Sequence, residues 1–284
     1  MRETVRSFRV ATWLGWQIES NWTDPFLFFV YSIVKPVSSV MILVIMYWVI
    51  TRTDTTSPFF TYMYLGNAAY IYVGSILVGV SWAVIDDREH YQTLKYIYVS
   101  PIKFYFYLLG RGAARFFTGT LSVAITLTFG LLVLRLPIEL AQVNWPYLAV
   151  STLLGLAGLA VMGLLLGAAT LQMARHFWSV GESVAGALYL VCGAIFPLDV
   201  LPAWLQPLGL ALPLTYWLES LRRAVLGSAA SREISPRLAV ISDDQILLIL
   251  LGSTLVLGLL SVWFFRWSEH RAREKGLIDI TTHY

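Results

Sequence analysis

The side chains best suited to chemistry lie in one polar island of the sequence, residues 86–103. The island begins with four groups that can bind a divalent cation, Asp86, Asp87, Glu89 and His90. Carboxylate oxygens are preferred ligands of Mg²⁺, so this cluster could form a metal site. Apolar segments flank the island, which ends at a Ser-Pro step before the next apolar segment. The same pattern is typical of a short helix held outside an apolar bundle, where a partner can push on it.

The composition places the chain in a membrane. Hydrophobic residues make up 57% of the 284 residues and charged residues 13%, with a mean hydropathy of +0.68. A soluble domain carries about 25% charged residues. The net charge of +3 is too small to indicate nucleic-acid binding, and the single cysteine, Cys192, excludes an intramolecular disulfide. We expect one membrane domain over residues 1–284, without a cleavable signal peptide.

Several segments have the roughly 20 mostly apolar residues that a helix needs to cross a bilayer. The six predicted spans are Phe26–Ile50, Tyr64–Ile85, Phe104–Leu134, Tyr147–Met173, Trp178–Phe196 and Ile246–Trp267. We therefore predict an all-α membrane protein with six transmembrane helices. Placing both termini in the cytosol puts most Lys and Arg residues, and the island 86–103, on the cytosolic side, as the positive-inside rule requires.

Two further segments are expected at the membrane surfaces. Residues 1–25 mix Arg with Trp, a composition that suits the headgroup layer and predicts an interfacial helix. Prolines divide residues 197–214 into apolar pieces that are each too short to span a bilayer. Irregular backbone at membrane depth must be buried in protein or line a cavity, so we expect re-entrant helices at the outer face. An ordinary proline-rich outer loop is the alternative.

Two segments in this order resemble one family. Glu89-His-Tyr-Gln-Thr-Leu-Lys-Tyr-Ile-Tyr-Val-Ser-Pro-Ile-Lys103 is similar to the cytosolic segment of ABC type-2 (ABC-2) exporter permeases, in which an acidic residue, Thr-Leu-Glu and Ser-Pro follow one another. The segment from Gly193 to Arg222 is similar to the family's late signature, in which spaced prolines precede a Tyr and a Glu-x-x-Arg step. The spans and the N-terminal helix also agree. Lys95 stands where the family commonly has Glu, a charge reversal that alters the surface offered to a partner.

The resemblance implies a permease subunit of an ATP-driven exporter, one half of a dimer that forms the substrate path. The implied substrates are drug-like amphiphiles, lipids or lipid-linked glycans. No catalytic residue and no cofactor are expected in this chain, because ATP and Mg²⁺ would bind to separate cytosolic ATPase subunits. The sequence has no G-x-x-x-x-G-K-[ST] phosphate loop, which agrees with that division.

The expected partners are those ATPase subunits, a second permease subunit and the lipid bilayer, without nucleic acid. The expected location is the cell membrane of a bacterium or archaeon, as a multi-pass protein with both termini in the cytosol.

The resemblance also implies two groups of site residues. The group expected to couple the chain to the ATPase is Glu89, Gln92, Thr93, Leu94, Ile97, Ser100 and Pro101. The group expected at the outer gate or along the substrate path is Lys35, Asn67, Phe196, Pro197, Tyr216, Glu219 and Arg222. Lys35 and Asn67 are included for their polar side chains within apolar spans, and they could instead snorkel to the interface or form a helix-packing seam. Thr93, Leu94 and Ile97 could instead pack on the protein's own loops. Glu219 and Arg222 are one helical turn apart, which predicts a local ion pair at membrane depth.

A membrane-embedded transferase of the polyprenyl type is the alternative function. Such enzymes hold a diphosphate through Mg²⁺ between two acidic clusters on the same side of the membrane. Here the second acidic pair, at residues 243–244, is predicted on the side opposite to Asp86 and Asp87. We therefore expect no metal site.

Overall fold

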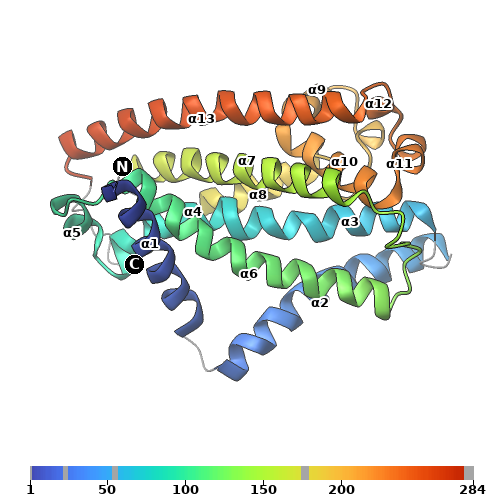
Figure 1. The fold of residues 1–284 in the computed structure, drawn as a ribbon, viewed down its shortest axis with the longest axis horizontal. Coiled ribbons are helices and arrows are strands. Elements are labelled where there is room, and N and C mark those ends of the chain that lie inside the picture. Colours follow the sequence, from blue (N-terminus) through green and yellow to red (C-terminus); the bar gives the residue numbers. More distant parts are fainter. Residues whose placement is uncertain (1, 22–24, 53–56, 174–178, 278–284) are drawn as a thin grey trace.

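The protein, in a computed structural model, is a bundle of long helices that run along one axis (Figure 1). The structure describes residues 2–21, 25–52, 57–173 and 179–277. Within these ranges five helices are long and apolar enough to cross a membrane, which confirms the predicted all-α membrane fold. They are α2 (Pro25–Thr51), the continuous helix Pro58–His90, α6 (Phe104–Leu132), α7 (Trp145–Leu171) and α13 (Asp243–Glu274).

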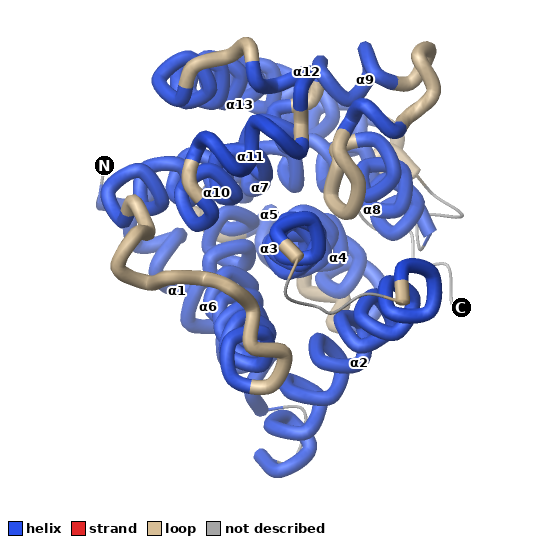
Figure 2. The backbone as a smooth tube through the Cα atoms, turned by 90° about the vertical axis from the view of Figure 1, so that its right-hand side faces the viewer, coloured by secondary structure: helices blue, strands red, loops and turns tan. Residues whose placement is uncertain are grey.

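The continuous helix Pro58–His90, called the central helix below, lies in the middle of the bundle. Seen along its axis, it has other helices around it (Figure 2). It is the most buried of the five, with 72% of its apolar window buried against at most 39% in the others. Its first part is apolar on every face, as expected for a helix inside a core. It consists of α3 (Pro58–Tyr72), the π-helical turn η1 (Val73–Val78), α4 (Gly79–Ile85) and the π-helical turn η2 (Asp86–His90).

Local sequence signals explain where three of the long helices begin. The Ser57 side chain caps α3, and Pro58 follows it at the first turn, where a missing N–H is harmless. The side chain of Asn144 caps α7 in the same way. At α13, Ser242 and Gln245 form a reciprocal capping box. These caps satisfy backbone N–H groups that would otherwise lack partners at the helix ends.

Helix α1 (Arg2–Asn21) packs along α6 and crosses the bundle at an oblique angle (Figure 1). Two glycines allow the close approach. A Cβ on Gly110 would lie 2.5 Å from the carbonyl oxygen of Phe8, and one on Gly15 would lie 2.9 Å from the Cβ of Ala114. The predicted helix in residues 1–25 is thus present, and its position at a membrane interface stays a prediction.

The fifth predicted span is shorter than expected. Of Trp178–Phe196, helix α8 covers Val180–Val191, 12 residues, and the chain then turns at Gly193 with φ +74°. Twelve residues are too few to cross about 30 Å of hydrocarbon, so the predicted six crossings are not confirmed. Trp178, the first residue of the predicted span, lies outside the described part of the chain.

The prolines break the chain after α8 as predicted. The short elements that follow are η4 (Leu198–Val200), α9 (Gln206–Ala211), α10 (Pro213–Leu226), α11 (Ser228–Ile234) and α12 (Pro236–Ala239). Two of these helices, α10 and α12, start at a proline, and α9 has one in its first turn. Whether the segment 197–214 enters the membrane from one face stays a prediction.

The polar island 86–103 is divided between two elements. Residues Asp86–His90 continue the central helix as η2, and the separate helix α5 spans only Leu94–Val99. Gln92, with φ +51°, turns the chain between them. Figure 1 places α5, the start of α1 and the end of α13 at one end of the bundle, here called the α5 end. Helices α9, α11 and α12 lie at the opposite end, here called the α11 end.

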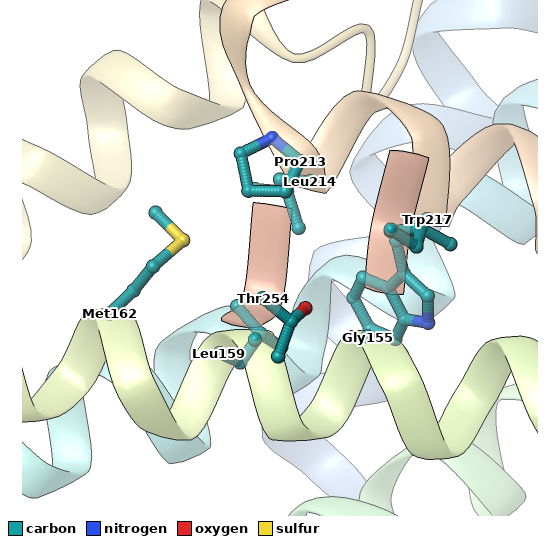
Figure 3. Close-up of a pocket in the computed structure, with 9 residues that line it drawn as sticks. Gly155, Leu159, Met162, Pro213, Leu214, Trp217 and Thr254 are labelled. Carbon is teal, nitrogen blue, oxygen red and sulfur yellow. The ribbon is translucent and has the colours of Figure 1, made fainter. Parts of the chain in front are cut away.

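Helix α10 packs against α7 through one large side chain. The indole of Trp217, 1% exposed, lies over Gly155 (Figure 3). A Cβ on Gly155 would lie 2.0 Å from the indole Cδ1 atom. Because the indole ring is rigid and enclosed, it cannot move aside as a flexible chain end would. The contact therefore requires glycine at this position.

We expect Gly155→Ala to lower the free energy of unfolding by about 1–3 kcal/mol, because overpacking a filled core displaces side chains and backbone. Thermal unfolding of the purified protein in detergent measures the effect. Gly252→Ala on α13 is the matched control, because a Cβ there would meet nothing within 4 Å. Equal melting temperatures for the two variants would contradict the packing of Trp217 on Gly155.

Candidate functional site

Two side chains anchor helix α5 to the bundle. Leu94 is 1% exposed and Ile97 is 7% exposed. Both belong to a hydrophobic cluster that contains Val84, Phe104 and Phe265, from α4, α6 and α13. Leu94 and Ile97 therefore pack on their own protein, as the alternative has it, and a contact of these two side chains with a partner stays a prediction. Their spacing predicts a shared face of the helix but does not say which way that face points.

The opposite face of α5 is free. Tyr96 is 67% exposed and Val99 is 89% exposed, and Lys95 between the anchors is also exposed. Of the predicted coupling residues, Gln92 and Pro101 lie on this exposed surface. An apolar residue with only a tenth of its surface covered, next to an exposed tyrosine, is suited to contact a partner.

The remaining coupling candidates make contacts within the chain. Glu89 accepts from Nε of Arg88 at 3.0 Å. The Thr93 hydroxyl donates to the Asp87 carboxylate at 3.4 Å, and the Ser100 hydroxyl donates to a carbonyl of α5 at 2.7 Å. The Thr93 bond ties the start of α5 to the central helix and the Ser100 bond closes its last turn, whereas the Glu89 bond lies within η2.

Arg111 forms ion pairs with the acidic cluster at the end of the central helix. Nη1 of Arg111 lies 3.4 Å from Oδ1 of Asp87, and its Nη2 lies 3.9 Å from Oδ2 of Asp86. Asp87 and Arg111 are 1% and 4% exposed, whereas His90 is exposed. In the described part of the chain no group of three or more His, Cys, Asp or Glu side chains is placed to hold a metal ion. The geometry is that of a buried ion-pair network, which gives the transferase alternative no support.

A further ion pair beside this network joins α1 to α6. Nη2 of Arg115 on α6 lies 2.7 Å from Oε1 of Glu19. Burial raises the pKa of the Glu19 carboxyl, and the nearby charges of Arg115 and Arg111 partly offset that rise. The oblique helix α1 is thus joined to α6 by charge as well as by the glycine contacts.

A second polar cluster lies near the α11 end and centres on Glu219. This carboxylate is fully buried and accepts three hydrogen bonds, from Arg223 at 3.0 Å, from Ser231 at 2.8 Å and from Tyr62 at 3.3 Å. The donors come from α10, α11 and α3. A buried carboxylate is tolerated when a charge and hydrogen bonds compensate it, and both are present here.

Arg223 connects α10 to the start of α13. Besides Glu219, its guanidinium donates to Oδ1 of Asp243 at 2.8 Å and to the carbonyls of Leu238 and Ile241 at 2.6 and 2.8 Å. One side chain therefore holds two carboxylates and two backbone groups, so α10, α12 and α13 meet at this point.

The predicted Glu219–Arg222 ion pair is replaced by the Glu219–Arg223 pair. Arg222, 2% exposed, donates to the carbonyls of Gly193 and Ala194 at 2.8 and 2.7 Å and to that of Tyr62 at 3.1 Å. Its guanidinium carbon also lies 3.8 Å from the centre of the Tyr62 ring. Both arginines are one turn from Glu219, so the spacing cannot predict which of them pairs with it. The contacts with other helices determine the pairing.

Three other predicted gate residues lie beside this cluster. Asn67 on α3 is 6% exposed and accepts from the Tyr189 hydroxyl on α8 at 2.7 Å. Phe196, 43% exposed, and the buried Pro197 follow the turn that Arg222 holds. The structure therefore brings the predicted residues of α3, α10 and the turn after α8 together at one junction.

Two predicted gate residues take no part in the junction. The Tyr216 hydroxyl donates to the carbonyl of Leu210 at 2.7 Å and fixes α9 against α10. Lys35 lies on the exposed side of α2. These contacts give neither residue a role beside Glu219.

A cavity between α7, α10 and α13 is too small to be a substrate path. It is bounded by Leu159, Met162, Pro213 and Thr254, among others (Figure 3). Its volume is about 10 Å³, whereas pockets for drug-sized ligands measure roughly 300–1,000 Å³. Any path of that size must lie elsewhere.

The sequence reasoning missed several members of the two clusters. Tyr62, Arg223, Ser231 and Asp243 bind Glu219 or its partner, and Arg111 binds the acidic end of the central helix. A charge within an apolar span is a signal for such a role, and Arg111 carries that signal. Tyr62 and Ser231 carry none, because buried hydroxyls are common.

A family model described as ABC-2 type transporter matches residues 6–226 of the chain. No curated protein matches it significantly. The matched range ends at Leu226, the last residue of α10, so it includes both polar clusters except for the partners contributed by α11 to α13.

We expect Arg223→Gln to destabilise the protein by about 3–5 kcal/mol, because it leaves a buried carboxylate unpaired. Arg237→Gln is the control, because this arginine is half exposed and 3.9 Å from Asp199, and exposed pairs contribute about 0–1 kcal/mol. Reversible unfolding in mixed detergent micelles measures both.

The same assay separates the two candidate partners of Glu219. In double-mutant cycles, we expect a larger interaction energy between Glu219→Gln and Arg223→Gln than between Glu219→Gln and Arg222→Gln. The reverse order would show that the sequence-based pairing was correct.

Proposed function

We infer the role of this chain from its family, because it belongs to the ABC-2 type transporter family and is a multi-pass membrane permease subunit of an ABC transporter. We propose that it works as an exporter, in a dimer that encloses the substrate path, with separate cytosolic ATPase subunits. ATP and Mg²⁺ would bind to those subunits. The proposed location is the cell membrane, with both termini and α5 on the cytosolic side.

The arrangement of α5 is the observation that carries this proposal. One face of α5 is anchored through Leu94 and Ile97 to a cluster shared by four of the long helices and by α1. The other face exposes Tyr96 and Val99 beyond the end of the bundle. A force applied to the exposed face by an ATPase would reach the spans through the packed face, because packed cores transmit displacement and do not absorb it.

The junction of α3, α8 and α10 is the proposed outer gate. It lies at the end of the bundle opposite to the α5 end (Figure 1), and the central helix runs from one to the other. The central helix carries Tyr62 near one end and the Asp86–Asp87 pair near the other, so a shift of the helix would act on both clusters.

The proposed substrate is an amphiphile, either drug-like, a lipid or a lipid-linked glycan. The interior cavity between α7, α10 and α13 is far too small for any of these, so the proposed path lies between two copies and not in this cavity. Lipid-facing helix surfaces that close against each other in a dimer can enclose a path of suitable width. Because such a path lies at the interface, its residues come from both subunits.

We expect Val99→Asp to abolish recovery of the ATPase with the purified chain and to abolish ATP-driven transport. A carboxylate in an apolar contact costs several kcal/mol unless it is neutralised. Val240→Asp is the matched control, because Val240 is equally exposed, at 89%, but lies near α12. The assay is affinity purification from native membranes, followed by ATP hydrolysis measurements.

Two results would contradict the expected difference between Val99→Asp and Val240→Asp. If both variants retain full ATPase activity, α5 is not the docking element and another surface must be sought. If both lose it, the loss comes from misfolding, and the melting temperatures would show this. Leu94→Ala, by contrast, should lower stability by about 2–5 kcal/mol through a core cavity and weaken docking only indirectly.

The proposed orientation is tested by labelling single cysteines. Cys192 is buried and is replaced by Ala to remove any background. A cysteine replacing Val240 should react with an impermeant thiol reagent in intact cells, whereas one replacing Tyr96 should react only after permeabilisation. Both positions are exposed, so accessibility alone cannot separate them. The opposite labelling pattern would place α5 outside and exclude its role with a cytosolic ATPase.

A further inference from the structure

A groove between α1 and α6 presents exposed aromatic rings. Its volume is about 540 Å³. The residues that line it are Phe8, Arg9, Thr12, Trp13, Trp16 and Phe117. Trp13 is 63% exposed and Phe117 is 54% exposed. Aromatic side chains gathered on one exposed surface indicate an interaction site, because isolated exposed rings are common but clusters are not.

The shape of the groove is fixed by the packing beneath it. The close approach of Phe8 to Gly110 holds the first half of α1 on α6. The rings of Trp16 and Phe117 meet edge to face, with centroids 6.5 Å apart, and join the two walls. The ion pair of Glu19 with Arg115 holds the second half of α1. The groove therefore exists before any ligand binds.

Basic residues followed by aromatic residues along the groove match the order of headgroup and acyl chains in a phospholipid. Arg6 and Arg9 are exposed, and among the described side chains neither forms an ion pair. Helix α1 starts near the α5 end and runs obliquely across the bundle and away from that end (Figure 1), so Arg9 comes before Trp13 and Trp16 along that direction. With the α5 end at one membrane surface, this order sets Arg9 nearer to the headgroups than Trp13 and Trp16.

We propose that the groove binds one anionic phospholipid of the surrounding bilayer. Arg9 would bind the phosphate, and one acyl chain would lie on Trp13, Trp16 and Phe117. Arginine recognises phosphate oxygens through its planar pair of donors, and the indole rings suit the boundary between headgroup and chain. The proposal requires only that the chain lies in a membrane and does not depend on its role as an exporter.

A second aromatic groove provides an internal control. It lies on α13 alone and is lined by Trp263, Arg266, Trp267 and His270. It has aromatic and basic side chains too, but a single helix lines it, whereas α1 and α6 both line the first groove. If composition alone decided lipid binding, both grooves would bind equally.

The experiment uses the full-length chain in vesicles of equal phosphatidylglycerol and phosphatidylcholine content. Native mass spectrometry after extraction measures which lipid stays bound. We expect one phosphatidylglycerol to be retained, and Arg9→Gln to lower its retention about fivefold, since one basic residue near an anionic surface contributes about 1 kcal/mol. Trp13→Ala should lower it as well. Arg266→Gln and Trp263→Ala should not.

A crosslinking arm locates the lipid and identifies other occupants. Phosphatidylglycerol with a photoreactive acyl chain should label peptides of α1 and α6. Three outcomes would overturn the proposal. The two lipids could be retained equally, the α1 and α13 variants could have equal effects, or the labels could be confined to other helices. A cysteine at Phe117 that forms a disulfide with a second copy would also overturn it, because the groove would then be a subunit contact. Arg9 is exposed, so the melting temperature of Arg9→Gln should match that of the wild type.

Discussion

The structure depends on how closely the neighbouring helices approach the central helix. In a bilayer, apolar side chains gain nothing by leaving lipid, so helices associate through packing at short range, and small residues permit it. A Cβ on Gly112 or Gly119 of α6 would lie 2.8 or 2.9 Å from a side chain of the central helix, and one on Gly163 of α7 would lie 3.1 Å away. Backbones that approach this closely exclude lipid from the central helix. The burial of Pro58–His90, and with it the position of both polar clusters, follows from these small residues.

The two polar clusters share one physical solution and differ in the helices that they connect. Near each end of the central helix, arginines compensate carboxylates that burial would penalise, from another helix at Asp87 and from the same helix at Glu219. At the α5 end, Asp87 and Arg111 connect the central helix to α6. Near the α11 end, Glu219 and Arg223 connect α10 to short helices with few turns. Short helices have little stability of their own, so the second junction is the one more easily rearranged.

Length and apolar pattern were sufficient to predict the long helices, because those are the signals that a membrane imposes on a sequence. The bounds of α2, α6, α7 and α13 lie close to the predicted spans. The length of α8 was not predictable, since an apolar run continues past Gly193 and only the left-handed backbone there ends the helix. The direction of Leu94 and Ile97 was not predictable either, because a helix of six residues is apolar on more than one side. Which arginine pairs with Glu219 depends on the positions of Asp243, Gly193 and Ala194, and these cannot be derived from the spacing of residues along one helix.

Arg222 takes over the role that water plays at the ends of helices in soluble proteins. The turn that follows α8 leaves the carbonyls of Gly193 and Ala194 without partners in the helix, and both residues are buried from solvent. The guanidinium solvates both, together with a carbonyl of α3, while its flat face rests on a tyrosine ring. An ammonium group has no flat face and cannot reproduce this arrangement, so lysine is no conservative replacement here. The turn after the 12-residue helix α8 can lie inside the bundle because a side chain from another helix supplies partners for its carbonyls.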